Sequence, residues 1–275
     1  MADCNHDCSN CSESDCSERK IEKLKPHQFS SFRKTFAVIS GKGGVGKSLV
    51  TSLLASALNK RGHSVAIIDA DVTGPSIPQA FGLKGKLAPQ DDSGLYPLLS
   101  PHGIKIMSAN CLLEDAEDPI CWRGPLIAGF VQQLYTDVIY GDVDYLLIDM
   151  PPGTGDVPLT VFQSYPIDGI IVVSSPQELV SMVVAKSINM AKMMYVDILG
   201  VAMNMAYVKC PKCNEKIVVF GNGKYKEDVK RHGLEVLAEI PIDPELATKV
   251  DQGKVEEYET DALDELVHRV EEYKK

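Results

Sequence analysis

The stretch Gly41-Lys42-Gly43-Gly44-Val45-Gly46-Lys47-Ser48 decides the fold of this chain. It follows the apolar run 36–39 and opens a segment with helical periodicity, which is the setting of a phosphate-binding loop. Glycines let backbone N–H groups surround phosphate oxygens, and the helix N-terminus adds the positive end of its dipole. Lys47 is expected to reach the β- and γ-phosphates and Ser48 to bind Mg²⁺. The stretch predicts a nucleotide-binding protein, against the weaker alternative of a glycine-rich turn without a ligand.

Beyond this loop, short apolar runs alternate with helix-length segments, a pattern typical of a mostly parallel sheet flanked by helices. The apolar runs are 36–39, 65–68, 104–107, 145–148, 169–173, 199–203 and 236–240, and the helical segments are 47–60, 177–194 and 261–273. The apolar stripe of the last helix is expected to pack on the sheet, because a membrane-surface helix would carry more base than acid. That stripe consists of Leu263, Leu266, Val267 and Val270. We therefore predict an α/β fold of the P-loop NTPase type.

The overall composition is that of a globular protein of 275 residues, with 44% hydrophobic residues and a formal net charge of -10. The negative charge disfavours a protein that coats DNA. No apolar run approaches the roughly 18 residues that a membrane span needs. The polar, acidic start of the sequence does not resemble a secretory signal. We expect a cytoplasmic protein that binds neither nucleic acid nor a membrane.

Eight cysteines need an explanation, because disulfides are rare in the cytosol. We divide the chain into a cysteine-rich tail at 1–30, flexible unless a metal orders it, and a nucleotide-binding domain at 31–275. The spacing of the tail cysteines allows one chain to wrap a [4Fe–4S] cluster, although a zinc-binding tail or opportunistic metal binding remains open. These four cysteines are Cys4, Cys8, Cys11 and Cys16.

A second cysteine site is the Cys-Pro-Lys-Cys motif of Cys210 and Cys213, which we place in an insertion near 207–220. It supplies two thiolates, whereas tetrahedral zinc or an iron–sulfur cluster usually takes four ligands. The same pair from a second subunit would complete the set. Half of a zinc knuckle and a redox dithiol are the alternatives. The remaining Cys111 and Cys121 are interpreted as ordinary, semi-buried cysteines.

Acidic residues follow two of the expected strands. Asp69-Ala70-Asp71 ends the second run, and Asp149 ends the run 145–148. Ligands of open α/β folds gather at the carboxyl edge of the sheet. Because a desolvated carboxylate without a partner is costly, carboxylates in such positions favour a functional site over a purely structural one.

Lys42 gives the loop a second lysine, and in this it resembles the deviant Walker-A class, which includes partition ATPases, division-site ATPases and the nitrogenase iron protein. The resemblance implies that Lys42 crosses a dimer interface to the partner's nucleotide. It implies that Asp71 orients the attacking water and that Asp149 helps to hold Mg²⁺ through water. It also implies an adenine contact by Asn204 and a base-flanking loop at Pro241. Because no Asn-Lys-x-Asp guanine motif is present, ATP is favoured over GTP.

Over residues 30–260, the ordered set of motifs resembles the Mrp/ApbC/Nbp family of iron–sulfur cluster carrier or scaffold ATPases. The motifs are 41–48, Asp-Ala-Asp-Val-Thr-Gly-Pro-Ser at 69–76, Trp-Arg-Gly-Pro at 122–125, Asp-Met-Pro-Pro-Gly-Thr-Gly-Asp at 149–156 and Cys-Pro-Lys-Cys at 210–213. The resemblance implies a homodimeric ATPase that holds a labile [4Fe–4S] cluster between two Cys-x-x-Cys pairs and passes it to apo-proteins. The tail is similar to that of eukaryotic cytosolic members, although its first two cysteines lie closer together. The alternatives are a division-site or partition ATPase, an electron-transfer ATPase, and an ATPase with structural zinc.

Overall fold

The computed structural model describes residues 23–72, 74, 76–112, 124–153, 155–176, 180–221 and 223–274. The four tail cysteines Cys4, Cys8, Cys11 and Cys16 lie outside the described residues, as do Cys121, Trp122 and Arg123.

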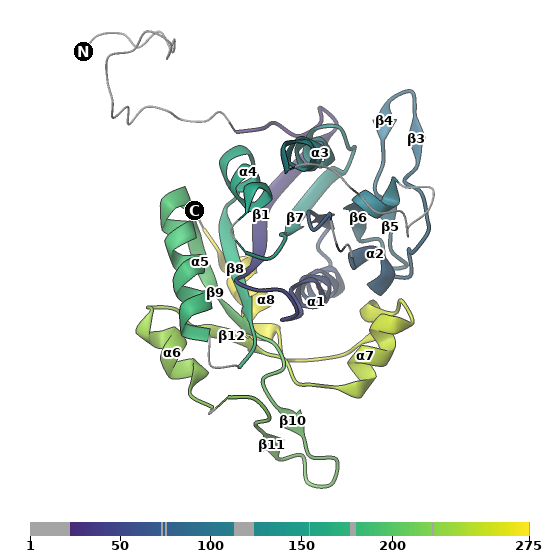
Figure 1. The fold of residues 1–275 in the computed structure, drawn as a ribbon. Helices are drawn as coiled ribbons and strands as arrows, with labels where there is room; N and C mark the ends of the chain where they lie inside the picture. Colours follow the sequence, from purple (N-terminus) through teal and green to yellow (C-terminus); the bar gives the residue numbers. More distant parts are fainter. Residues whose placement is uncertain are drawn as a thin grey trace, which may run out of the picture.

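One eight-stranded sheet forms the centre of the domain, in the order β12-β9-β8-β1-β7-β2-β6-β5 (Figure 1). Adjacent strands are parallel except at the edge, where β5 runs antiparallel to β6. The strands are β1 (Ser30–Ser40), β2 (Val65–Asp69), β5 (Leu98–Leu99), β6 (Lys105–Ser108), β7 (Gly141–Asp149), β8 (Gly169–Ser174), β9 (Asp197–Met203) and β12 (Val236–Glu239). Each predicted apolar run overlaps one of these strands, so the predicted mostly parallel α/β sheet is confirmed.

Helices cover both faces of this sheet. The connection from β1 to β2 and the connections from β7 through β8 to β9 run in opposite directions, so right-handed crossovers put their helices on opposite faces. On the first face α1 (Lys47–Lys60) packs beside α8 (Asp264–Glu272). The second face carries α3 (Gly124–Thr136), α4 (Asp156–Ser164), α5 (Val180–Met194) and α6 (Tyr225–Arg231).

Shorter elements connect these layers. Two short helices, α2 (Ile77–Ala80) and α7 (Pro244–Asp251), pack against each other, and the 3-10 turns η2 (Ala109–Cys111) and η3 (Val255–Glu257) lie in loops. Two small hairpins stand apart from the main sheet: β3 (Gln90–Asp91) with β4 (Gly94–Leu95), and β10 (Val208–Lys209) with β11 (Lys216–Ile217). The β10–β11 hairpin projects from the body of the domain in Figure 1.

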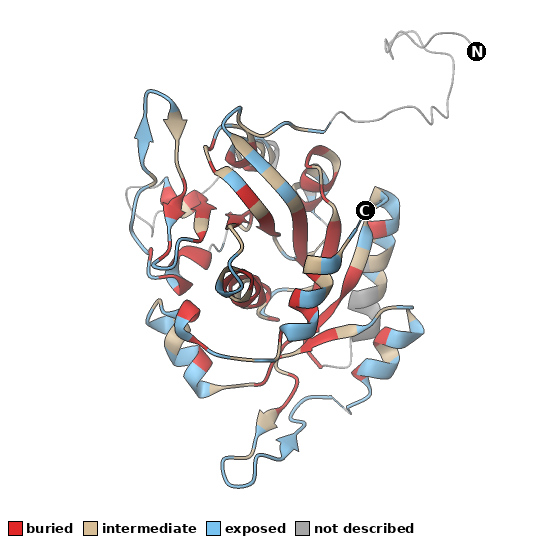
Figure 2. Ribbon diagram, turned by 180° about the vertical axis from the view of Figure 1, so that it is seen from behind, coloured by how far each residue is buried: buried red, intermediate tan, exposed pale blue. Residues whose placement is uncertain are grey.

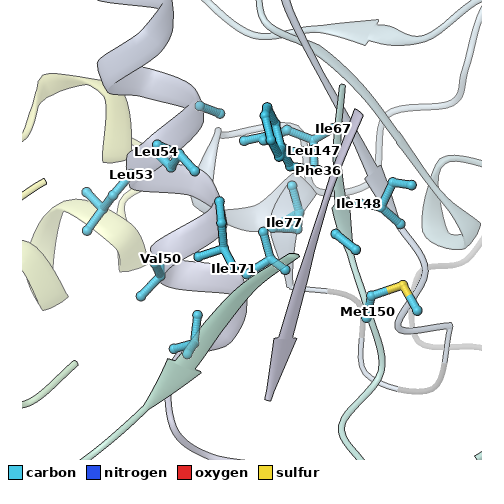
Figure 3. Packing of buried hydrophobic residues seen from close by; sticks show 14 of the residues in the cluster. Phe36, Val50, Leu53, Leu54, Ile67, Ile77, Leu147, Ile148, Met150 and Ile171 are labelled. Atoms are coloured by element: carbon cyan, nitrogen blue, oxygen red, sulfur yellow. The ribbon is translucent and has the colours of Figure 1, made fainter. Parts of the chain in front are cut away.

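The core extends over both faces of the sheet, and between the central strands and α1 side chains from the two layers interdigitate (Figure 3). Strand residues Phe36, Ile67 and Leu147 are fully buried, and they face Val50 and Leu54 of the helix. The helix begins at Lys47 and ends at Lys60, as predicted. Removing a buried side chain such as that of Leu54 is expected to cost about 2–5 kcal/mol. The core therefore fixes the helix whose first turn carries the phosphate-binding loop.

The C-terminal helix α8 packs through the predicted stripe, because Leu263, Leu266, Val267 and Val270 are all buried. Figure 2 shows buried residues along the strands of the main sheet and exposed ones along the β10–β11 hairpin. Within the described ranges, no helix has both the length and the apolar character that would let it cross a membrane.

Candidate functional site

A cavity opens where β1 ends and α1 begins, at the carboxyl edge of the sheet. Its volume is about 280 Å³. The phosphate-binding loop lines it together with residues from the ends of other strands and from neighbouring helices: Ser40, Gly43, Gly44, Val45, Gly46, Lys47, Ser48, Leu49, Ser52, Asp71, Ser76, Ala80, Pro152 and Val250. Strands β7 and β8 lie next to β1 on opposite sides. The cavity therefore lies beside the point where the strand order reverses.

The glycines of the loop have geometric reasons to be glycine. Gly44 has a φ of 75° and Gly46 a φ of 79°, in the left-handed region that side chains with a Cβ disfavour. A Cβ on Gly46 would also lie only 2.1 Å from Nδ2 of Asn204. A Cβ on Gly44 would meet no protein atom within 4 Å, because Gly44 borders open space. The loop is therefore a backbone cradle with room above it, as phosphate oxygens require.

Asn204 ties this loop to the far side of the sheet. The residue follows β9, is 3% exposed, and donates from Nδ2 to the carbonyl oxygen of Val45 over 2.9 Å. Its own backbone N–H donates to the carbonyl oxygen of Ser174 over 2.8 Å, so its position is fixed by the end of β8. The side-chain amide of Asn204 thus holds the shape of the loop.

A buried ionic cluster lies beneath the loop. Lys47 is 6% exposed and Asp149 is 0% exposed, and Lys47 Nζ lies 2.6 Å from Asp149 Oδ2. Ser48 Oγ donates to the same carboxylate oxygen over 2.6 Å, and Thr51 Oγ1 donates to Oδ1 over 2.7 Å. A buried charge needs this degree of pairing, because desolvating it without a partner is costly. The lysine and the hydroxyl of the loop are therefore pre-assembled on one carboxylate.

A second carboxylate, Asp69, lies beside the first. It is fully buried, and in the β2–β7 ladder it is the register partner of Asp149. Burial raises the pKa of Asp69 well above its usual range, and the neighbouring Asp149 charge raises it further. The backbone N–H of Asp71 donates to Asp69 Oδ1 over 3.1 Å, and Ser108 Oγ donates to Oδ2 over 3.4 Å. Asp69 therefore anchors the start of the loop that carries Asp71 to the cavity wall.

The donors around the cavity fit a nucleotide with Mg²⁺. The glycine cradle leaves room for phosphates, and Lys47 supplies a cation at its base. Ser48 and Asp149 offer hard oxygen ligands, which are the ligands that Mg²⁺ prefers. The cavity can thus hold phosphates against a helix N-terminus, where the dipole favours negative charge.

The structure brings most of the predicted phosphate-site residues together, but not all. Gly41 and Lys42 are not among the residues that line the cavity, although Ser40 and Gly43 on either side of them are. The carbonyl oxygen of Lys42 accepts a hydrogen bond from Ser40 Oγ over 3.0 Å. Pro241 is buried after β12, where its neighbour Ile240 donates to the carbonyl oxygen of Met203. Pro241 and Asn204 are not among the residues that line the cavity. The base contacts assigned to them stay predictions.

Sequence reasoning missed two residues of this site, Thr51 and Ser108, and did not predict the pairing of a third, Asp69. Thr51 holds Asp149 from one turn further along α1, and a polar residue one turn after Lys47 on a largely apolar helix was the available signal. Asp69 was seen only as part of a motif, since its pairing with Asp149 depends on strand register. Ser108 comes from the neighbouring strand β6, and no local pattern marked it.

The second candidate site is the turn of the β10–β11 hairpin. Cys210 is half-buried and Cys213 is exposed. The turn is closed by backbone hydrogen bonds from Cys210 N–H to the Glu215 carbonyl and from Asn214 N–H to the Cys210 carbonyl, each 2.9 Å long. Asn214 has a φ of 60°, which asparagine tolerates better than most residues. The turn therefore presents both thiols at the end of a projecting hairpin.

The thiol of Cys210 has a lowered pKa. Backbone N–H groups of Lys212 and Cys213 donate to it and lower its pKa, and the Cys213 side chain acts in the same direction. In contrast, burial raises the pKa of Cys111 to about 11. Cys111 is thus more deeply buried than we expected. Within the described part of the chain, no group of three or more His, Cys, Asp or Glu residues is arranged to hold a metal ion.

Known proteins match nearly the whole domain. A ParA family model described as a NUBPL iron-transfer P-loop NTPase matches residues 31–273. An iron–sulfur cluster carrier protein of Clostridium perfringens is 43% identical over 250 residues, covering 88% of this chain and 87% of the relative. One from Methanocaldococcus jannaschii is 42% identical over 262 residues, covering 92% and 90%.

Solved structures also match most of this chain. A nucleotide-binding protein of Archaeoglobus fulgidus in complex with ADP is 46% identical and superposes with a TM-score of 0.76, covering 85% of this chain and 91% of that one. A chain of the MinC:MinD cell division protein complex from Aquifex aeolicus has a TM-score of 0.61 at 19% identity, over 88% of this chain and 97% of that one, and shows the fold alone. The chain therefore belongs to the family of iron-transfer P-loop NTPases, as the resemblance of its motifs implied.

Proposed function

We propose that this protein is an ATP-hydrolysing carrier of [4Fe–4S] clusters, that it works as a homodimer in the cytoplasm, and that it passes clusters to apo-proteins. The observation that carries the proposal is the presence of two sites in one domain: a phosphate cradle with its lysine and carboxylate assembled, and an exposed pair of thiols. Relatives that match most of the chain are named as iron–sulfur cluster carriers, which supports the same conclusion.

The phosphate site supports hydrolysis through positioning and charge. Lys47 and Ser48 both contact Asp149; with nucleotide bound, Lys47 would turn toward the β- and γ-phosphates, and Ser48 and Asp149 would be the residues that hold Mg²⁺. Bound Mg²⁺ supplies positive charge that offsets the charge on the transferring phosphoryl group. Asp71 lines the cavity, where its carboxylate would accept a hydrogen bond from the attacking water. Because the backbone N–H of Asp71 donates a hydrogen bond to the buried Asp69, the backbone of Asp71 is held in place before the nucleotide binds.

The dimer supplies what each chain lacks. Lys42 lies just outside the residues that line its own cavity, which supports its action on the nucleotide of the partner subunit. Cys210 and Cys213 give two thiolates, and the same pair from the partner completes the four that a [4Fe–4S] cluster takes. The cluster is cargo here, so its sites must release it. Exposed thiols at the end of a projecting hairpin suit that requirement better than a buried cage.

The hydrolytic part of the proposal is tested by phosphate release from ATP with Mg²⁺. Lys47→Ala and Asp71→Asn are expected to lower kcat at least about a hundredfold, the scale seen when charge-stabilising or proton-accepting groups are removed. Exposed Lys84→Ala serves as the control and should leave the rate unchanged. A rate of phosphate release from GTP equal to that from ATP would contradict the proposal that ATP is the substrate.

The cargo is tested by anaerobic reconstitution with iron and sulfide. In a background without the four tail cysteines, Cys210→Ala and Cys213→Ala are each expected to abolish the cluster absorbance and the bound iron. Cys111→Ala is the matched control, because that thiol is buried in the domain. Unchanged cluster content in both hairpin variants would exclude the shared site. Stoichiometric zinc without iron, in protein purified without air, would favour structural zinc instead.

A further inference from the structure

The backbone of Asp149 is fixed from both sides, which leaves its side-chain torsions to decide where the carboxylate points. The Asp149 carbonyl oxygen accepts a hydrogen bond from the N–H of Ala70, which follows β2, over 2.9 Å. The N–H of the next residue, Met150, donates to the carbonyl oxygen of Val38 in β1 over 3.1 Å. Strands β1 and β2 are the two neighbours of β7 in the sheet. The orientation of the carboxylate therefore depends on the side chains that contact its two oxygens.

Three side chains of α1 hold the carboxylate, and they divide between its oxygens. Lys47 Nζ and Ser48 Oγ each lie 2.6 Å from Oδ2, whereas Thr51 Oγ1 lies 2.7 Å from Oδ1. Thr51 follows Lys47 by four positions, so both side chains project from the same face of the helix. Thr51 is thus the residue of α1 that holds the second oxygen.

The hydroxyl of Thr51 has two acceptors within reach but one proton to donate. Besides Asp149, the carbonyl oxygen of Lys47 lies 3.0 Å from Oγ1, in the back-bond that a helical threonine often makes. A hydrogen bond to a carboxylate is shorter and stronger than one to a neutral carbonyl, so the proton belongs to the 2.7 Å contact with Asp149. A valine at position 51 would have a similar shape and would leave Oδ1 without this donor.

Thr51 differs from the other two donors in its place relative to the cavity. Lys47 and Ser48 line the cavity, and in the proposed function they would turn toward the phosphates and Mg²⁺. Thr51 is not among the lining residues and is fully buried. A nucleotide in the cavity would therefore draw Lys47 and Ser48 from Asp149 and leave the bond from Thr51 in place.

We propose that Thr51 is a positioning residue of the nucleotide site, whose hydroxyl keeps the Asp149 carboxylate oriented for Mg²⁺ after Lys47 and Ser48 have turned to the nucleotide. This inference rests on the proposed function and adds to it a residue outside the loop 41–48. Thr51 acts through Asp149 and contacts neither phosphate nor metal. Loss of a partner that orients a metal-holding group typically lowers metal affinity about 10–100-fold.

Two pairs of proteins isolate the hydroxyl. Thr51→Val keeps the branched shape of threonine without the hydroxyl, and Thr51→Ser differs from Thr51→Ala by the hydroxyl alone. Isothermal titration of Mg²⁺ into the complex with ADP, the nucleotide that the solved Archaeoglobus fulgidus relative holds, measures metal affinity without hydrolysis. The Kd for Mg²⁺ should rise about tenfold in Thr51→Val, at the lower end of the range for such partners. Thr51→Ala should weaken Mg²⁺ binding in the same way, and Thr51→Ser should retain it.

A difference between metal and nucleotide affinity separates positioning from damage to the fold. With a chelator present, ADP should bind equally well to unaltered protein and to Thr51→Val, because Thr51 does not line the cavity. Thr248→Val is the matched control. Thr248 Oγ1 donates to the carbonyl oxygen of Pro244 over 2.8 Å, a back-bond of the same kind in α7, and Thr248 is exposed. This variant should leave both affinities unchanged.

The outcomes that overturn the inference are distinct from those that overturn the proposed function. Unchanged Mg²⁺ affinity in Thr51→Val and Thr51→Ala would exclude the positioning role. Equal losses of ADP and Mg²⁺ affinity in these variants would also exclude it, because they would indicate a distorted loop. If circular dichroism shows that Thr51→Val does not fold, the comparison of Thr51→Ser with Thr51→Ala decides. Unaltered protein that binds neither ADP nor Mg²⁺ would refute the proposed nucleotide site, and this inference with it.

Discussion

Lys47 and Asp149 form a buried ion pair in the nucleotide site, and this pairing leads to a prediction about stability. Removing one partner leaves the other charged and buried, so Asp149→Asn is expected to cost about 3–5 kcal/mol of unfolding free energy. The double variant with Lys47→Met should cost less than the sum of the single variants, because no unpaired charge remains. Urea unfolding of the nucleotide-free protein measures both. Lys60 and Glu259 form an exposed pair with an N–O distance of 2.7 Å, nearly as short as that of the buried pair, and Glu259→Gln should change stability little.

Gly46 is the loop position where two constraints coincide, and Gly44 offers a matched comparison. Both have left-handed backbone, so Gly→Ala costs about 1–2 kcal/mol at either site from conformation alone. Only at Gly46 would the new Cβ also collide with Asn204. Gly46→Ala should therefore destabilise the protein more than Gly44→Ala, by thermal unfolding. Adding Asn204→Ala should recover the excess at Gly46 and nothing at Gly44; equal effects at the two glycines would contradict the contact.

The raised pKa of Asp69 predicts a pH dependence of stability. Because the folded state holds the proton to higher pH than the unfolded state does, the folded protein binds more protons over that interval. Stability should then fall as pH rises from about 4, the unfolded pKa, by at most about 1.4 kcal/mol per pH unit until the folded pKa is reached. Asp69→Asn keeps the acceptor for the Asp71 N–H and removes the titration. Its advantage over the natural sequence should grow with pH in urea titrations, and a constant difference would contradict burial as the cause.

At the scale of elements, the sequence predicted what depends on local pattern. The apolar runs, the helix α1 and the buried stripe of α8 follow from periodicity and from the loop that opens the helix. Strands β3, β4 and β5 were missed because each has two residues, too few for a pattern. The contact of Asn204 with Val45 spans 159 positions in sequence, and the meeting of Asp69 with Asp149 depends on strand register. Such contacts are products of the tertiary structure.

Cys210 in the β10–β11 hairpin and Cys111 in the turn η2 differ in thiol pKa and in burial, and we therefore expect them to differ in reactivity. The lowered pKa of Cys210 means that its thiolate is present at lower pH than for an ordinary thiol, so iodoacetamide should label it progressively below pH 8.5. Cys111 has a pKa raised to about 11 and is 1% exposed, so it should stay unlabelled until the protein unfolds. Mass spectrometry across a pH series, in native and denatured protein, measures both. Equal labelling of the two cysteines in the native state would contradict the described hairpin.

For the whole molecule, the proposed sharing of the nucleotide site and the proposed sharing of the thiol site both require two copies of the chain to align. The cavity and the hairpin lie on the same domain, and a two-fold axis would pair each feature with its own copy. In the proposed dimer, Lys42 is the residue that reports on the arrangement, because it would contribute to the nucleotide site of the partner subunit.

Mixing two inactive variants tests that arrangement directly. Lys42→Ala and Lys47→Ala should each abolish hydrolysis as homodimers. In a mixed dimer, the Lys42→Ala subunit keeps its own Lys47 and receives Lys42 from its partner. One of the two nucleotide sites of the dimer is then complete. Random mixing should therefore restore about a quarter of the unaltered rate, since half of the dimers are mixed and each has one working site. Analytical ultracentrifugation with ATP confirms that mixed dimers form. If they form and no activity returns, Lys42 acts within its own chain, and the thiol pairs lose the reason to share a cluster across the same axis.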